Sequence, residues 1–142
     1  MLFFTECLQV DLTIALDSSG SVRAAGWQKL LQFTEQLVSR LVLSPDCAQV
    51  ALVSFGNTAY VESTLTSDPD AIYDVIPNMR FRDEWTNTAA VFKVMTEDIY
   101  WESNGARAEA TKFCILVTDG PSNREEQYTV PNAQVSQALH TF

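Results

Sequence analysis

The segment from Ala15 to Val22, with the sequence ALDSSGSV, places one carboxylate and three hydroxyls on a turn directly after an apolar run. A turn needs only one or two such residues, usually a glycine with an Asp or Ser that bonds its own backbone. In an extended turn, Asp17, Ser19 and Ser21 can all point to one side. This surplus of oxygen-bearing side chains predicts a ligand site.

Two predicted strands end at aspartates. Apolar residues alternate with polar ones from Leu8 to Leu16, which predicts a strand that delivers Asp17, and the apolar run 113–117 predicts another that is followed by Asp119. In an open parallel sheet the ligand site lies beyond the carboxyl ends of the strands, where the connections diverge. We therefore expect Asp17 and Asp119 to be neighbours.

The remaining periodicity completes an α/β fold with a mostly parallel sheet. Segment 49–55 reads as a buried strand, and Gly56 and Asn57 form a turn that leads into an edge strand over 59–65. Helical spacing predicts four helices: from Trp27 to before Pro45, over 68–76, through Val91, Met95 and Ile99, and from Thr129 to the last residue. His140, on the last of these helices, is expected to be a surface residue.

A threonine loop, Thr86 to Thr88, precedes the third predicted helix and brings Thr86 to the same edge. Taken alone, Thr86 is better interpreted as a cap of that helix than as a ligand, and Thr88 could take either role. The candidate ligand set is then Asp17, Ser19, Ser21, Thr86 and Asp119, all oxygen donors. Such a set suits a hard cation such as Mg²⁺ and serves Zn²⁺ badly. Because only two of the five are anionic, a bound dication would favour a further carboxylate from a partner.

Composition narrows the classes of partner. The 142 residues fit one domain, 1–142, with 46% apolar residues, and the net charge of -9 disfavours nucleic acid. No apolar run is long enough to cross a bilayer. The cysteines, Cys7, Cys47 and Cys114, lack a zinc spacing, and their odd number leaves at least one unpaired or bonded outside this chain. Cys114 is expected to be a buried free thiol.

Three motifs in order resemble the von Willebrand factor type A (vWA) family: DSSGS at 17–21, TNT at 86–88 and ILVTDG at 115–120. The resemblance is greatest to extracellular matrix members, such as matrilins and type VI collagen chains, and to collagen-binding integrin inserts. It implies a Rossmann-like three-layer α/β/α fold with one antiparallel edge strand. It also implies a metal-ion-dependent adhesion site built from the five oxygen donors named above. The chain ends before the last strands and helices of the family, so we expect a truncated domain with the strand at 113–117 as a sheet edge.

The resemblance further implies an extracellular adhesion module of a longer chain, which uses Mg²⁺ or Mn²⁺ to capture a Glu or Asp of a protein partner such as collagen or another matrix protein. Cys7 would then pair with a cysteine beyond the C-terminal helix, which this chain lacks. Trp27, Trp85 and Trp101 are expected to pack internally, although Trp85 could instead line the rim of the site. Arg80 and Arg82 are either solvated or on that rim.

Two alternatives remain. An intracellular vWA scaffold would assemble protein complexes, in some cases without the metal. An enzyme would need a second carboxylate beside the ion and a positive residue for phosphoryl transfer. Ser19 stands where that carboxylate would help, and no lysine is near the motifs in sequence. We therefore expect no catalysis.

Overall fold

The computed structural model describes residues 6–120. The predicted helix from Thr129, with His140, lies outside the described residues. Four strands form one sheet in the order β3-β2-β1-β4. The strands are β1 (Val10–Asp17), β2 (Ala48–Phe55), β3 (Ala59–Thr66) and β4 (Thr111–Val117). β1 pairs parallel with β2 and β4, while β3 pairs antiparallel with β2. The predicted mostly parallel sheet with an antiparallel edge strand is confirmed.

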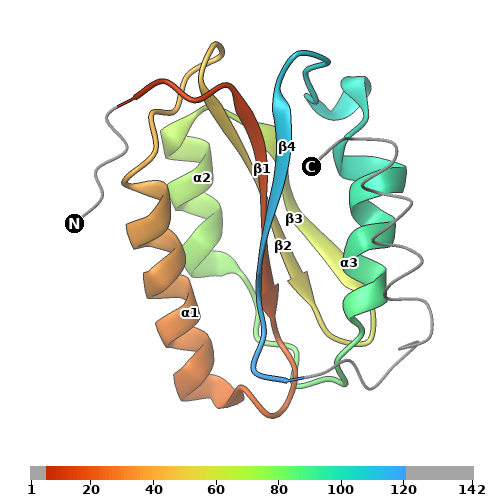
Figure 1. Cartoon of the computed structure of the whole chain (residues 1–142). Coiled ribbons are helices and arrows are strands. Elements are labelled where there is room, and N and C mark those ends of the chain that lie inside the picture. Colours follow the sequence, from red (N-terminus) through yellow and green to blue (C-terminus); the bar gives the residue numbers. More distant parts are fainter. Residues whose placement is uncertain (1–5, 121–142) are drawn as a thin grey trace.

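Helices cover both faces of the sheet, giving three layers (Figure 1). α1 (Arg23–Val38) and α2 (Pro69–Val75) lie on one side, and α3 (Thr88–Val94) lies on the other. A 3-10 turn, η1 (Ile76–Asn78), follows α2; a π-helical turn, η2 (Met95–Ile99), continues α3; and a 3-10 turn, η3 (Glu102–Asn104), precedes β4. The first helix begins and ends earlier than its periodicity suggested.

Strand β1 is the centre of this arrangement, since seven of its eight residues are buried. Its side chains alternate between two apolar clusters, with Ile14 facing the α1 and α2 side and Ala15 facing the α3 side. Trp27 is 1% exposed in the first cluster, and its indole N–H donates to the carbonyl of Met79 at 3.2 Å. Burial on both faces fixes the register of β1 and therefore the position at which Asp17 leaves the sheet.

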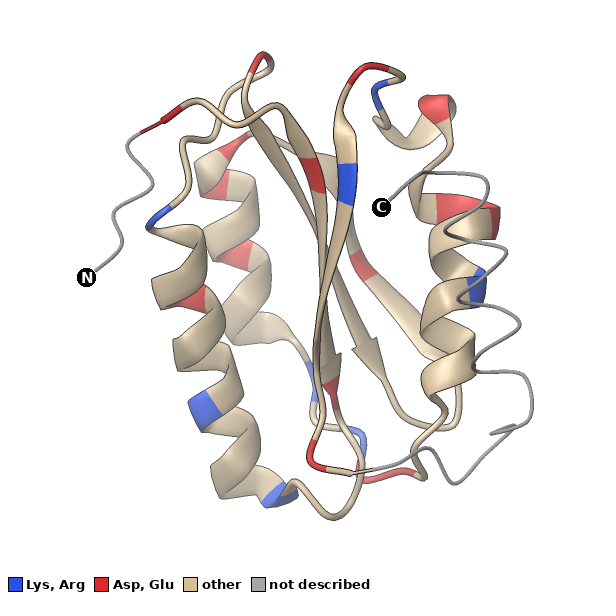
Figure 2. Ribbon diagram, viewed as in Figure 1, with Lys and Arg blue, Asp and Glu red and all other residues tan. Residues whose placement is uncertain are grey.

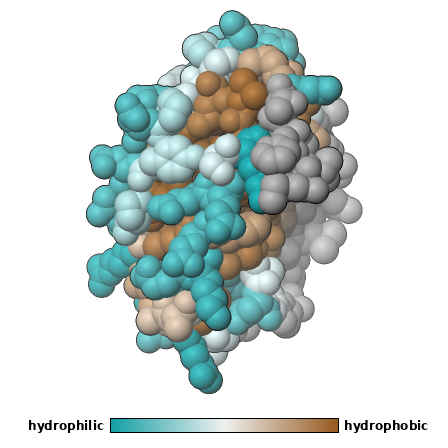
Figure 3. All heavy atoms as spheres, turned by 90° about the vertical axis from the view of Figure 1, so that its left-hand side faces the viewer, coloured by the Kyte–Doolittle hydropathy of each residue, from teal (hydrophilic) through white to brown (hydrophobic). Residues whose placement is uncertain are grey.

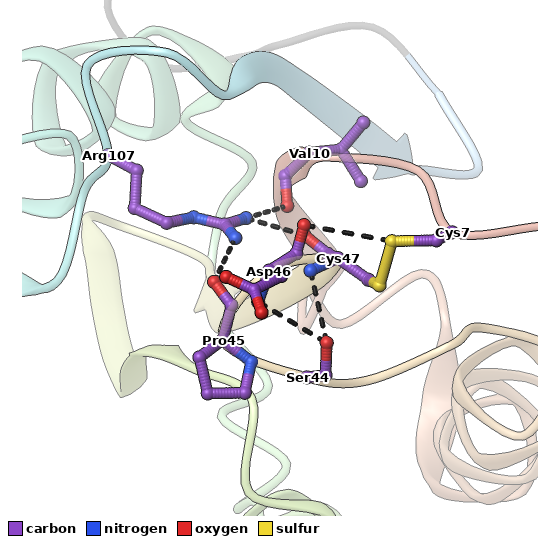
Figure 4. The surroundings of a disulfide bond; sticks show 7 residues. All are labelled: Cys7, Val10, Ser44, Pro45, Asp46, Cys47 and Arg107. Atoms are coloured by element: carbon purple, nitrogen blue, oxygen red, sulfur yellow. Dashed lines mark hydrogen bonds between the residues drawn. A yellow bond between two sulfur atoms is a disulfide. The ribbon is translucent and has the colours of Figure 1, made fainter.

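The disulfide differs from the expectation. Cys7 is bonded to Cys47, 40 residues away, whereas the resemblance had implied a partner beyond the C-terminal helix. The bond joins the segment before β1 to the segment before β2, at the end of the sheet remote from Asp17 (Figures 1 and 4). Cys114 is a free thiol on β4, half-buried rather than fully enclosed. A parallel β-bridge between Leu43 and Ala48 leads the chain into β2 beside this bond.

A buried ionic network lies at the same remote end and was not predicted. Asp11 is fully buried, and its carboxylate pairs with Arg107 at 3.0 Å and with Lys112 at 3.1 Å. The Arg107 guanidinium also donates to the carbonyls of Pro45, Val10 and Cys47 at 2.7, 2.8 and 2.7 Å (Figure 4). Figure 2 shows the acidic position of β1 beside the basic position of β4. This network ties η3 and β4 to the disulfide segment.

Candidate functional site

The first loop brings three of the predicted residues together. Oδ1 of Asp17 accepts a hydrogen bond from the backbone N–H of Ser19 at 2.8 Å, which closes the turn after β1. The hydroxyls of Ser19 and Ser21 lie 3.1 Å apart. Asp17 and Ser19 are buried, at 0% and 2% exposed, whereas Ser21 is open to solvent. The predicted alternation of this loop is therefore present.

Residues after β4 complete one side of this cluster. The Ser21 hydroxyl donates to Oδ1 of Asp119 at 2.9 Å, and the Thr118 hydroxyl donates to Oδ2 of Asp17 at 2.7 Å. Since the Ser21 proton goes to Asp119, the Ser19 hydroxyl is the donor in the contact with Ser21. Four predicted oxygen donors thus form one hydrogen-bonded cluster at the carboxyl ends of neighbouring parallel strands.

Thr86 faces the same place from the third loop. It is 4% exposed and lines a hollow of about 510 Å³ together with Ser19, Ser21, Glu84 and Trp85. Asn87 occupies the N-cap position of α3 and accepts from the N–H of Ala90 at 3.2 Å. The capping reading of Thr86 and Thr88 is thus wrong, because Asn87 performs that role.

The rim residues have different surroundings. Trp85 is 57% exposed at the hollow, and Trp101 is 56% exposed elsewhere, so neither is the internal packing residue that one reading expected. Arg82 is not solvated: its guanidinium lies 3.6 Å over the Tyr60 ring and 3.2 Å from Glu62. Arg80 is exposed. Neither arginine lines the hollow, and their rim role stays a prediction.

A second hollow, of about 310 Å³, lies on the other side of Ser21, between α1 and the end of β4. Asp17, Asp119 and the apolar residues Leu30 and Val117 line it. Lys29 lines it too, so a lysine does come close to the motifs in space, contrary to the reading of the sequence. Figure 3 views the α1 side and shows apolar surface between hydrophilic side chains there, and Phe33 of α1 is 45% exposed.

Sequence reasoning missed Glu84. Its backbone carbonyl accepts from the N–H of Gly20 at 2.9 Å, and the chain forms a parallel β-bridge between Ser19 and Glu84. Its carboxylate accepts from the N–H of Asn57 at 2.8 Å and from the Tyr60 hydroxyl at 2.9 and 3.0 Å. Partial burial, and next the hydrogen bond to Glu84, raise the pKa of the Tyr60 phenol, which keeps it a donor. Only the short spacing to Thr86 could have pointed to Glu84.

Backbone strain accompanies these loops. Two non-glycine residues of the described chain have positive φ, Arg23 at 62° and Asp83 at 54°. Arg23 opens α1 two residues after Ser21, and Asp83 precedes Glu84 in the third loop. Strained conformations of this kind persist where surrounding contacts over-determine the backbone, and they gather at functional sites. Both therefore belong to the loops that carry the candidate ligands.

The donor set fits a hard cation. The predicted set consists of two carboxylates and three hydroxyls, without nitrogen or sulfur, which is the ligand chemistry of Mg²⁺ or Mn²⁺. Residues 6–120 contain no group of three or more His, Cys, Asp or Glu side chains that could hold a metal. Figure 2 shows both acidic and basic positions at this end of the sheet. The geometry defines a class of open α/β domain with an oxygen-lined site at the switch point.

The chain belongs to the von Willebrand factor type A domain family, which it matches over residues 11–140. It is 32% identical to matrilin-1 of Homo sapiens over 79% of this chain and 23% of that protein. It is 31% identical to integrin alpha-1 of Gallus gallus over 83% of this chain and 42% of that protein. Identity to the collagen alpha-4(VI) chain of Mus musculus is 30%, over 87% of this chain and 6% of that protein. The chain thus spans less than half of each of these relatives.

Solved structures agree on the fold. Proximal thread matrix protein 1 from the mussel byssus superposes with a TM-score of 0.84 at 23% identity, covering 95% of this chain and 36% of that one. The same mussel protein has been solved with zinc occupying its MIDAS motif, and that structure gives a TM-score of 0.82.

The relatives by sequence are adhesion proteins of the extracellular matrix or the cell surface, and the extracellular location expected from the sequence is consistent with them. No helix within residues 6–120 has the length and apolarity needed to cross a lipid bilayer.

Proposed function

We propose that this domain binds Mg²⁺ or Mn²⁺ through its loop oxygens and captures an acidic residue of a protein partner. The ligands are Asp17, Ser19, Ser21, Thr86 and Asp119. The observation that carries the proposal is the continuous cluster from Ser19 through Ser21 to Asp119, with hydroxyl and carboxylate oxygens 3.1 and 2.9 Å apart. Oxygens at such distances can turn their lone pairs to one shared point.

The chain's own residues have separate roles in this proposal. The Ser19 N–H holds Oδ1 of Asp17 and the Thr118 hydroxyl holds Oδ2, so the carboxylate is oriented before any ligand arrives. Ser21 and Asp119 are exposed and form the entrance. The two aspartates formally balance the charge of a bound dication, and neutral hydroxyls and water would fill the rest of its shell. Its open coordination position would accept a Glu or Asp of the partner.

Extracellular binding is favoured over the intracellular scaffold by the Cys7–Cys47 bond, because disulfides persist in oxidising compartments. The partner would be a matrix protein such as collagen, with Trp85, Arg80 and Arg82 on the rim of the contact. We propose no catalysis, because Ser19 rather than a carboxylate stands beside Asp17. The position of the lysine is not a reason, since Lys29 lines the second hollow together with Asp17 and Asp119.

Calorimetric titration of Mg²⁺ into the purified chain tests the metal site. Saturable binding that is lost in Asp17→Ala and Ser19→Ala, and kept in the matched control Ser63→Ala on edge strand β3, is the expected result. Binding of the loaded domain to immobilised collagen, reversed by a chelator, then tests the partner. A folded wild-type chain that takes up no Mg²⁺ or Mn²⁺ would contradict the proposal.

A further inference from the structure

Glu84 contacts three segments that the candidate site depends on. Its carbonyl receives the N–H of Gly20 in the first loop, at 2.9 Å. Its carboxylate receives the N–H of Asn57, in the turn between β2 and β3, and the hydroxyl of Tyr60 on β3. Glu84 itself stands two residues before Thr86. One residue therefore links the loop of Ser19 and Ser21 to the loop of Thr86.

The turn between β2 and β3 is shaped around this side chain. A Cβ added at Gly56 would lie 2.6 Å from Oε2 and 2.7 Å from Cβ of Glu84, so the close approach requires glycine. The residues beside Thr86 are tied to the same turn: the N–H of Trp85 donates to Oδ1 of Asn57 at 3.2 Å, and the N–H of Asn87 donates to the Gly56 carbonyl at 2.8 Å. The third loop is thereby fixed on both sides of Thr86.

We propose that Glu84 is a positioning residue that preforms the cation site, an inference that rests on the proposed function. It holds Thr86 at its distance from Ser19 and Ser21 before a cation arrives. Glu84 is a positioning residue rather than a ligand in this proposal, because its carboxylate accepts from Asn57 and Tyr60, in the turn after β2 and on β3, and not from the loops of the candidate ligands. A site whose loops are already ordered binds without the cost of ordering them. Residues that orient ligands in this way typically change metal affinity 10- to 100-fold when mutated.

Three variants separate positioning from simple charge. Glu84→Ala removes the carboxylate and its contacts. Asp83→Asn removes a neighbouring negative charge from the same rim; its carboxylate makes no hydrogen bond or ion pair within the described chain, and Asn tolerates the positive φ there. Tyr60→Phe keeps the charge of Glu84 and the ring beneath Arg82 and removes the phenolic donor.

The experiment is a Mn²⁺ titration of the wild-type chain and these variants, with amide hydrogen exchange of the metal-free proteins. We expect affinity to fall about 10- to 100-fold in Glu84→Ala. Affinity should fall less in Tyr60→Phe, and by under about threefold in Asp83→Asn, since exposed charges are screened. Protection of the Asn57 and Gly20 amides should drop in Glu84→Ala without metal.

Equal losses in Glu84→Ala and Asp83→Asn, or unchanged affinity in Tyr60→Phe, would assign the effect to charge and overturn the positioning role. If the wild-type chain binds Mn²⁺ and Glu84→Ala binds it with the same affinity, the positioning role is overturned as well, but the proposed function is not. A wild-type chain that binds no Mn²⁺ would instead overturn the proposed function itself. If circular dichroism shows Glu84→Ala to be unfolded, Tyr60→Phe decides the question alone.

Discussion

The hydroxyl of Ser21 donates a hydrogen bond to Oδ1 of Asp119 across 2.9 Å, joining residues that are 98 positions apart. The contact exists because β1 and β4 are adjacent and parallel, so that their carboxyl ends deliver both loops to one place. The Ser21 proton bonds to a lone pair of Asp119 Oδ1 that a cation could use, while the lone pairs of the Ser21 oxygen remain available. Ser21 can therefore serve the site in two ways, as a donor to Asp119 without metal and as an oxygen ligand with it.

Ser21→Ala should separate metal binding from stability. The Ser21 bond is solvent-exposed, so its loss should lower the free energy of unfolding without metal by no more than about 1 kcal/mol. Mg²⁺ at about 100 times its dissociation constant should stabilise the wild-type chain by about 2.7 kcal/mol. That increment should vanish in Ser21→Ala and remain in Ser63→Ala, as measured by urea unfolding. A full increment in Ser21→Ala would exclude this hydroxyl from the shell.

Reduction of the Cys7–Cys47 bond should destabilise the domain. The bond closes 40 residues and restricts the unfolded chain, which is typically worth about 2–4 kcal/mol. Cys7→Ser should show the same loss, measured by urea unfolding, and a reductant should have no further effect on that variant. Mass spectrometry of peptides that found Cys7 unpaired, or bonded to Cys114, would contradict the structure.

Loss of the Arg107 side chain should be severe. Arg107→Ala would leave the fully buried Asp11 carboxylate with the Lys112 ion pair and the retained backbone N–H of residue 107, and would remove the guanidinium bonds to three backbone carbonyls. Breaking a buried ion pair costs about 3–5 kcal/mol. Arg107→Lys should not restore stability, because an ammonium cannot reproduce the planar fork that reaches Pro45 and Cys47. Thermal unfolding compares both variants with Arg40→Ala, an exposed control. A shift no larger than the control's would show the network to be dispensable.

Stability should fall at alkaline pH. Burial raises the pKa of the Cys114 thiol to about 12, and it likewise raises the pKa of the Tyr100 phenol above its usual value. The folded chain then holds protons that the unfolded chain releases. The stabilisation is complete below the unfolded pKa, near 9 for the thiol, and is lost as the pH rises towards 12. Urea midpoints from pH 8 to 11 should decline, and less so in Cys114→Ala; a flat profile would contradict the shift.

The sequence predicted the sheet because apolar periodicity and strand ends are local signals. The alternation before Asp17 and the continuous run before Asp119 each located a strand correctly. The motifs also predicted the Ser19, Ser21 and Asp119 cluster, since parallel neighbours must deliver their ends together. Whether these residues hold a metal stays a prediction.

Pairwise contacts between distant residues were harder to predict. Nothing local marks Cys47 as the partner of Cys7, and the family resemblance pointed to another. Asp11 looked like an ordinary polar position of an alternating strand, yet it is enclosed by Arg107 and Lys112 from beyond η3. Glu84 gave no signal beyond its nearness to Thr86. Each of these depends on tertiary packing that no single segment encodes.

The location of bound Mn²⁺ tests the account most directly. The paramagnetic ion broadens the NMR signals of nearby nuclei, so an assigned spectrum maps the site without any mutation. We predict broadening at Ser19, Ser21, Thr86 and Asp119 together at substoichiometric Mn²⁺, with the amide of Arg107 at the opposite end of the sheet unaffected. Broadening centred on other acidic residues, or none in a folded chain, would contradict the claim that these loops form one cation site.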